Sequence, residues 1–305
     1  MKSVEYHLVD VFTDRAFGGN PLAVFIDARG LSAALMQSLA KEMNLSECTF
    51  VLPAEDPRNH YRVRIFTPDT ELPMAGHPIV GTSFVLAREQ MIEYSGDGVE
   101  ITLEEGIGPV PVGITFQAGL PAMIEMTQQL PSFARPLTDR AAVAAMLSLE
   151  VESLVPNLPV QVVSCGVPIL LVPLRDLEAA RAIKVRQDLL EQMLSTLGTH
   201  EVFVFTQEVE RSSSTIHSRM FAPGLGIAED PATGAASGPV GCYLVHHGII
   251  GAGPTTHIIS EQGIEMGRPS SIHVTIERDG GEITRVGVGG QRVYMGKGTI
   301  ELDIV

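Results

Sequence analysis

Short runs of hydrophobic residues, separated by glycine, proline and polar residues, dominate the first half of the chain. A run of about four to eight such residues, apolar throughout or alternating with polar ones, is typical of a β-strand. Helical spacing of the apolar positions predicts a helix over Leu31–Met43, and a proline suited to a first helical turn predicts another from about Pro78 to Glu89. The expected strands are Tyr6–Phe12, Leu22–Ile26, Cys48–Leu52, Tyr61–Phe66, Val99–Leu103 and Val110–Phe116.

The second half shows the same mixture of strands and helices. Neither half alternates them with the regular spacing of βαβ units, so the pattern favours an α+β fold over a doubly wound sheet. The expected helices are Asp139–Ser148, Asp188–Leu197 and Thr233–His246, and the expected strands are Ala122–Met126, Gln161–Val163, Ile169–Val172, His200–Thr206 and Ser218–Phe221.

A weak internal repeat relates the two halves. The first half carries Phe66-Thr-Pro68, a polar loop and then Gly76-His77-Pro78; the second carries Phe221-Ala-Pro223, a polar loop and then Asp230-Pro231-Ala-Thr-Gly234. Each is a strand, an F-x-P turn, a glycine-containing loop and a helix start. Because the order of elements matches, we expect duplicated halves over about 1–120 and 121–297, joined by a linker near Ala118–Gln128.

Composition narrows the class of protein. The 305 residues suffice for two domains with a core each, at roughly 150 residues per domain. With 21 basic and 36 acidic residues the formal charge is −15, which argues against a nucleic-acid partner. No run of about 18 apolar residues is present, so neither a membrane span nor a signal peptide is expected, and a cytoplasmic location is the default.

Known signature motifs are absent. The chain has no dinucleotide fingerprint, P-loop, H-E-x-x-H or G-x-S-x-G sequence, so we expect no nucleotide, metal or serine-hydrolase chemistry. Its three cysteines, Cys48, Cys165 and Cys242, are far apart and form no C-x-x-C, which argues against a disulfide framework or a zinc site. We expect Cys165 to be a buried small apolar residue.

Glu47 is a candidate proton carrier. It lies between a predicted helix and a strongly apolar strand, where removal of water would raise the pKa of its carboxyl group toward neutrality. The alternative is a solvated acid at a loop end.

His77 lies just before a predicted helix. The free N–H groups and positive dipole of a helix start attract carboxylates and lower the pKa of an imidazole, so a neutral His77 could hydrogen-bond a substrate. It could equally be a histidine that only caps a turn.

Asp230 opens the corresponding segment of the second half. An aspartate before a helix is commonly an N-cap. In a duplicated fold, however, it would occupy the place of His77. The polar stretch from Glu261 to Ser270 could bring Arg268 to the same cleft or could be a surface hairpin.

Together these segments resemble the phenazine-biosynthesis PhzF-like isomerases of the diaminopimelate epimerase superfamily. The similarity spans nearly the whole chain in the right order. The matching stretches are Val9-Asp10-Val-Phe-Thr with Gly19-Asn20-Pro21, Asn44-Leu-Ser-Glu47, the two F-x-P segments with the loops that follow them, and Glu261-Gln-Gly263 with Gly267-Arg-Pro-Ser270.

The resemblance implies two similar halves, each a curved sheet or open barrel around a central helix, with the active site between them. It also implies a homodimer that uses no metal or cofactor, and a C-terminal strand, about 298–305, that returns to the first half. The catalytic residues would be Glu47, His77 and Asp230, acting on a small cyclic amino- or hydroxy-carboxylate such as a dihydro-hydroxyanthranilate. Substrate binding would fall to Asn20, Gly76, Thr233, Gly234 and Ala235.

One position departs from the family pattern. The phenazine enzymes carry a serine where this chain has Ala235, so a hydroxyl that could bond the ring substrate is absent, although Ser237 lies two residues on. The departure leaves the substrate open and the proton-transfer residues in place.

Two other functions remain open from the sequence. Amino-acid racemases of the superfamily use one cysteine in each glycine-containing loop, and neither loop of this chain has one. A binding or regulatory protein could keep the cleft without turnover, but would not need a general base such as Glu47.

Overall fold

The computed structural model describes residues 2–251 and 253–302, which divide into two compact units. The first comprises Met1–Thr127 and Gly289–Val305, and the second comprises Gln128–Val288. The unit boundaries fall at 127/128 and 288/289, where the sequence led us to expect about 120/121 and 297/298. The expected linker at 118–128 is a turn followed by a strand that continues to Gln128.

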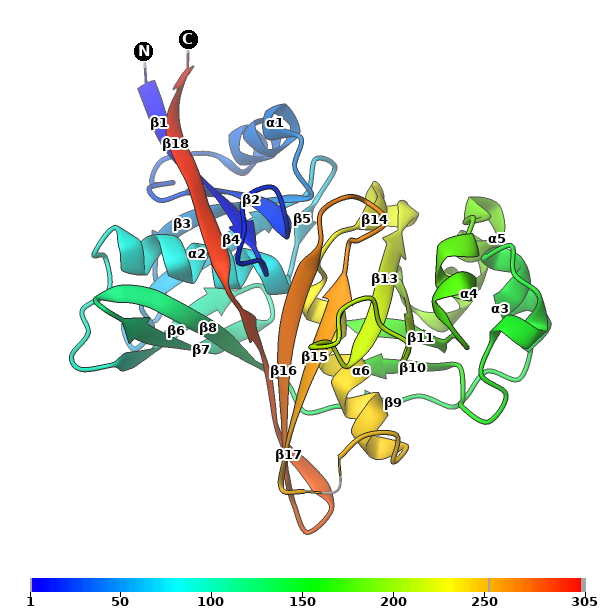
Figure 1. The fold of residues 1–305 in the computed structure, drawn as a ribbon. Coiled ribbons are helices and arrows are strands. Elements are labelled where there is room, and N and C mark those ends of the chain that lie inside the picture. The colour runs from blue at the N-terminus through cyan, green and yellow to red at the C-terminus, as the bar shows by residue number, and fades with distance from the viewer. Residues whose placement is uncertain (1, 252, 303–305) are drawn as a thin grey trace. The chain divides into compact units, whose positions relative to one another are not determined.

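Within the described residues, the first unit contains two helices and nine strands, one of which ends at Gln128, the first residue of the second unit. Its first and last strands pair antiparallel along their length, and Figure 1 shows them side by side. The expected C-terminal strand corresponds to the end of this last strand as far as residue 302; residues 303–305 lie outside the described residues. The elements are β1 (Lys2–Val11), β2 (Asn20–Phe25), α1 (Ala33–Met43), β3 (Glu47–Pro53), β4 (Tyr61–Phe66), β5 (Glu71–Leu72), α2 (Gly76–Arg88), β6 (Gly98–Glu105), β7 (Gly108–Gln117), β8 (Leu120–Gln128) and β18 (Arg292–Leu302).

In the part of the chain that the structure describes, the second unit contains four helices where the first has two. The first three of these four gather on one side of its strands (Figure 1), where their apolar residues form a core with the strands. The elements are β9 (Ser132–Phe133), α3 (Arg140–Met146), the 3-10 turn η1 (Val151–Ser153), β10 (Gln161–Ser164), β11 (Pro168–Pro173), α4 (Leu177–Ala182), α5 (Gln187–Leu197), β12 (Val202–Thr206), β13 (Ile216–Ala222), the 3-10 turn η2 (Pro223–Leu225), β14 (Ile227–Asp230), α6 (Gly234–His246), β15 (Thr255–Gln262), β16 (Ser270–Asp279) and β17 (Glu282–Gly290).

The strand pairings of the two units follow one pattern. In unit 1, β1–β2 is antiparallel, β2–β3 parallel, β3–β4 antiparallel, β4–β6 parallel and β6–β7 antiparallel. In unit 2, β10–β11, β11–β12, β12–β13, β13–β15 and β15–β16 repeat these directions in the same order. The helices α2 and α6 occupy the same place in this order and both have 13 residues. The expected duplication into two similar halves is confirmed.

The two faces of the unit 1 strands pack against different helices. In unit 1 the face of β3 that carries Cys48 and Phe50 packs on α1 in one apolar cluster. The opposite face meets α2, whose residues are buried almost throughout. At Gly81 of α2, a Cβ atom would lie 2.5 Å from the side chain of Leu22. Only glycine allows so close an approach of the helix to the sheet, and this contact fixes where the start of α2 lies.

Local differences from the expected elements have clear causes. Phe12 adopts a left-handed backbone with φ 65°, so β1 ends at Val11. Helix α2 begins at Gly76, which makes Pro78 its third residue; the first helical N–H groups need no partner within the helix, so proline is tolerated there. The long strands β15, β16 and β17 were not expected. Alternation of Ile272, Val274 and Ile276 is the signal that β16 carried.

Across the two described stretches of chain, no helix has both the length and the apolar character that crossing a bilayer requires.

Candidate active site

The central helices of both units begin without a side-chain cap. Helix α1 is capped by Ser32, α3 by Asp139 and α4 by Asp176, each side chain accepting a hydrogen bond from a backbone N–H of the first turn. No described side chain does this for α2, which follows Ala75, or for α6, which follows Thr233. The N–H groups at these two helix starts are therefore not committed to a cap, and such groups favour an anionic partner.

Three side chains of unit 1 meet at the start of α2. His77, the second residue of the helix, accepts a hydrogen bond at Nδ1 from Nδ2 of Asn20, the first residue of β2, at 3.0 Å. Its other ring nitrogen, Nε2, lies 3.3 Å from Oε2 of Glu47. All three residues are buried, with Glu47 7% and His77 3% exposed. The structure therefore brings together three of the residues expected from the sequence.

The contact with Asn20 defines the protonation of His77. Because the amide N–H of Asn20 donates to Nδ1, a neutral ring carries its proton on Nε2, on the side of Glu47. Burial lowers the pKa of His77 to about 3, so the ring is neutral at physiological pH. Burial, and not the helix dipole that the sequence led us to expect, is the cause of this lowering. A neutral imidazole beside a carboxylate can donate one hydrogen bond and carries no charge.

The position of Glu47 follows from the strands on either side. Glu47 begins β3 and pairs with Leu22 on the parallel strand β2, two residues beyond Asn20. Two residues further along β3, the hydroxyl of Thr49 lies 2.8 Å from that of Thr82 on α2. Since alternate residues of a strand share a face, Glu47 also faces α2. It is not the solvated loop acid that the sequence left open.

A second buried carboxyl group of unit 1 was missed. Glu105, the last residue of β6, faces the backbone N–H of Ala75, directly before α2. Burial raises the pKa of Glu105 to about 8, against the opposing effect of that N–H. The turn after Glu105 packs tightly on Pro73, whose carbonyl accepts from the N–H of Ile107. The local signal for its burial is the alternation with Ile101 and Leu103, which places Glu105 on the same buried face of β6.

In unit 2, a hydrogen-bonded network holds Asp230 and Thr233. The hydroxyl of Thr233 donates to Oδ2 of Asp230. The side chain of Gln262, at the end of β15, accepts from the N–H of Thr233 at 3.1 Å and donates to the Thr233 hydroxyl at 2.9 Å and to the Asp230 carbonyl at 2.7 Å. Since Oγ1 of Thr233 accepts from Gln262, its own proton points to Asp230.

The turn between β15 and β16 supports the same loop. Ser270 donates to the carbonyl of Pro231 at 2.7 Å. Gly263 has φ +73°, and a Cβ atom there would lie 2.5 Å from the carbonyl oxygens of Pro231 and Arg268. The polar stretch is a hairpin, as one of the two interpretations held, but Gln262 and Ser270 are buried. Sequence reasoning assigned neither a role, although both lie in stretches that matched the family.

The other expected residues of unit 2 surround the start of α6. Thr233 precedes the helix, and Gly234 and Ala235 are its first two residues. Asp230 ends β14, so it is not the N-cap. Counted from the helix start, the counterpart of His77 is Ala235; the expectation that Asp230 would occupy the place of His77 is wrong. The hydroxyl of Ser237 is bonded to the Thr233 carbonyl at 2.8 Å and is therefore committed within the helix.

The cysteines lie away from both helix starts. Cys48 points into the apolar cluster beneath α1, and burial raises the pKa of its thiol to about 12. Cys165 is buried, as expected, with its sulfur 3.8 Å from that of Cys242. Hydrogen bonding to Cys165 raises the pKa of the Cys242 thiol. None of these thiols is disposed to act as a base beside either glycine-containing loop.

Comparison with known proteins agrees with this architecture. Residues 9–298 match the family described as phenazine biosynthesis-like protein. An isomerase of Mesorhizobium japonicum described as uncharacterized is 36% identical over 98% of this chain and 99% of its own. The trans-2,3-dihydro-3-hydroxyanthranilate isomerase of Pseudomonas chlororaphis is 35% identical over 97% and 99%. A phenazine biosynthesis protein of the PhzF family from Bacillus anthracis superposes with a TM-score of 0.90 at 27% identity, covering 99% and 100%.

Two topologically equivalent halves, each with a buried helix that starts beside buried polar residues, define the fold class as diaminopimelate epimerase-like. Within that class, the chain belongs to the phenazine biosynthesis-like, or PhzF-like, family. Its relatives are named isomerases, and it is an isomerase of this family.

Proposed function

We propose that this isomerase moves a proton between two carbon atoms of a small cyclic amino- or hydroxy-carboxylate by general acid–base catalysis. The observation that carries the proposal is the buried contact chain from Asn20 through His77 to Glu47. The substrate of the Pseudomonas chlororaphis relative, trans-2,3-dihydro-3-hydroxyanthranilate, belongs to this chemical class and is the first compound to test.

Glu47 is proposed as the proton carrier. In the ionised form its carboxylate removes an acidic proton from a carbon atom of the substrate and becomes a carboxylic acid. The electrons of the broken C–H bond shift through the conjugated system, and Glu47 then returns the proton to another carbon. The net reaction conserves atoms and charge, and Glu47 finishes in its starting state.

His77 is proposed to orient this exchange. Its Nε2–H can donate to the carboxylate of Glu47 or to an oxygen or nitrogen atom of the substrate, and the Asn20 contact keeps the proton on that nitrogen. Because the imidazole stays neutral, it does not compete with Glu47 for the migrating proton.

Asp230 and Thr233 are proposed to bind polar groups of the substrate. Their orientation by Gln262 supports a binding role, since a fixed acceptor loses little freedom when the ligand arrives. The uncapped N–H groups at Gly76 and at Gly234–Ala235 are proposed to bind a carboxylate. Assembly as a homodimer is part of the same proposal, and sedimentation velocity tests it.

A binding protein without turnover is the second candidate. It needs the uncapped helix starts but has no use for a buried acid held next to a neutral imidazole. A racemase acting through paired thiols is disfavoured by the buried, weakly acidic cysteines.

The decisive experiment is proton NMR in deuterated water with cyclic amino- and hydroxy-carboxylates, including trans-2,3-dihydro-3-hydroxyanthranilate. Wild-type protein should exchange or relocate a carbon-bound proton, whereas Glu47→Gln should lose at least about 10³-fold in rate. Glu42→Gln, an exposed acid on α1, is the matched control and should behave as wild type. Binding without any exchange would favour the binding protein.

A further inference from the structure

We propose that Glu201 is the counterpart of Glu47 in the second unit and that its carboxyl group, whose Oε2 atom is buried, forms a hydrogen bond with the substrate. The inference rests on the proposed function, because it adds a substrate-binding group next to a residue named there. Glu201 lies in none of the motifs that relate this chain to its family.

Strand register makes the two glutamates equivalent. The phenylalanines of the two F-x-P turns provide the alignment. Phe66 pairs across the β3–β4 ladder with the residue that follows Glu47. Phe221 pairs across the β12–β13 ladder with the residue that follows Glu201. Glu47 is the first residue of β3, and Glu201 directly precedes β12; each of these strands runs parallel to the strand before it. The two glutamates therefore occupy equivalent positions in the duplicated fold.

The side chains of the two glutamates also face equivalent helices, α2 in unit 1 and α6 in unit 2. Glu47 faces α2. In unit 2, the ring of Phe205 on β12 packs edge-on against Tyr243 of α6 at 5.5 Å. Glu201 lies four residues before Phe205 and so shares its face. The intervening residue Val202 points the other way, into the core formed with α3, α4 and α5.

The carboxyl group of Glu201 is placed to be neutral. Its Oε2 atom is buried without a hydrogen-bond partner among the described residues. Burial raises the pKa of Glu201 to about 8, and the negative charge of Asp230 acts in the same direction. At neutral pH the group is therefore a carboxylic acid, which has one O–H to donate.

The other charged groups around Glu201 are engaged elsewhere. On β13, Arg219 is paired with Glu229 of β14, and His217 lies between Glu261 and Glu265. Strand β11 has no charged residue, and the one histidine of α6 is His246 at the far end of the helix. Helix α4 packs on the opposite face of β12, with Val202, and its Arg181 is paired with Glu210. Asp230 is thus the charge that acts on Glu201.

A neutral acid at this position has a chemical use. A substrate carboxylate or enolate oxygen would be repelled by an ionised Glu201 next to Asp230, whereas a protonated one offers it a hydrogen bond. The pair would then combine one acceptor, Asp230, with one donor, Glu201. Such a pair suits a ring that bears a carboxylate together with an amino or hydroxyl group.

Binding of cyclohex-1-ene-1-carboxylate, measured by calorimetry between pH 6 and pH 10, tests the proposal without requiring turnover. Wild-type affinity should fall about tenfold per pH unit above pH 8, as the donor is lost. Glu201→Gln keeps a donor of the same shape, so its affinity should stay within about twofold over that range. Glu201→Leu, which removes the donor, should bind at least about tenfold more weakly at pH 7.

Glu105→Gln separates this effect from that of the other buried acid whose pKa is about 8. The proposal is overturned if the loss of affinity above pH 8 is removed by Glu105→Gln instead of Glu201→Gln, or if Glu201→Gln retains that loss. It is also overturned if the wild type shows no loss of affinity above pH 8, or no binding at 10 mM ligand. Melting temperatures show whether each variant folds; Glu201→Met replaces the leucine variant if that one does not. Failure of every compound to exchange in the NMR experiment would defeat the proposed function and leave this binding result to stand separately.

Discussion

The amide nitrogen of Asn20 lies 3.0 Å from Nδ1 of His77, and this contact decides which ring nitrogen faces Glu47 with a proton. The two residues are 57 positions apart and come from β2 and the start of α2. The same strand start that orients the histidine also neighbours Glu47 through the parallel ladder. Strand β2 therefore positions both His77 and Glu47.

Asn20→Asp should reverse the histidine tautomer. A carboxylate accepts hydrogen bonds and does not donate them, so Nδ1 would carry the proton and Nε2 would face Glu47 without one. We expect kcat to fall about 10²-fold and the melting temperature to drop, because a carboxylate replaces a fully buried amide. Kinetics and ¹⁵N shifts of the His77 ring measure the two effects. Asn157→Asp, at an exposed site, is the control; an unchanged kcat in Asn20→Asp would show that the tautomer does not matter.

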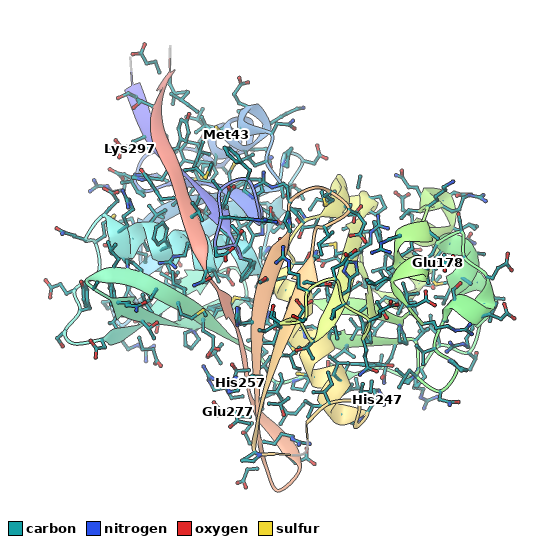
Figure 2. The ribbon with its side chains drawn as sticks, viewed as in Figure 1. Met43, Glu178, His247, His257, Glu277 and Lys297 are labelled. Atoms are coloured by element: carbon teal, nitrogen blue, oxygen red, sulfur yellow. The ribbon has the colours of Figure 1, made fainter. Side chains whose placement is uncertain are left out.

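Gln262→Leu should loosen the loop that carries Asp230. Three hydrogen bonds to the loop are lost, so we expect KM to rise about tenfold or more and the protein to lose about 1–3 kcal/mol of stability. Gln161→Leu is the matched control. It removes a buried glutamine of the same unit that bonds Ala134 and His247, the latter labelled in Figure 2 just beyond α6. Equal KM values in the two variants would assign Gln262 a purely structural role.

Phe17→Gly should stabilise the first unit. Phe17 has φ 67° and is 73% exposed, so its backbone is strained while its ring gains little from burial. Removing the Cβ atom should gain about 1 kcal/mol. Gln90→Gly tests the same physics at another exposed residue with φ 56°. Thermal unfolding of both variants is the measurement, and a lowered melting temperature for Phe17→Gly would mean that the ring packs on a partner surface.

Stability should depend on pH through His217. Burial alone would lower its pKa, but hydrogen bonds to Glu261 and Glu265 outweigh burial and raise the pKa to about 9. A histidine pKa raised above its unfolded value of about 6.5 contributes stability that is complete below pH 6.5 and is lost as the pH rises to about 9, by up to about 3 kcal/mol.

Chemical denaturation of wild type and His217→Gln across pH 6–10 measures this contribution. The difference in unfolding free energy between the two proteins should be largest at pH 6, shrink from about pH 6.5 upward and be nearly gone above pH 9. A difference that stays constant with pH would indicate that His217 is neutral in the folded protein.

The spacing of apolar residues predicted those helices and strands whose buried face can be recognised from neighbouring residues in the sequence. Helix α1 and strands β3 and β4 follow from apolar spacing, and the duplicated F-x-P turns pointed to two related halves. Strand β16 carried an alternating signal in Ile272, Val274 and Ile276, whereas threonine, serine and glycine dilute the alternation of β15 and β17, which are stabilised by pairing with their neighbours.

The sequence by itself determined the family and the two halves and marked Glu47, His77 and Asp230 as candidate catalytic residues, because short motifs and local spacing carry that information. Only the tertiary structure decided which side chains touch. Asn20 reaches His77 across 57 residues and Gln262 reaches Thr233 across 29, through strand register and a closely packed helix. It also showed that Glu105 is a buried acid and that the Oε2 atom of the partly exposed Glu201 is enclosed, because burial, which raises the pKa of a carboxyl group, is a property of the packed fold.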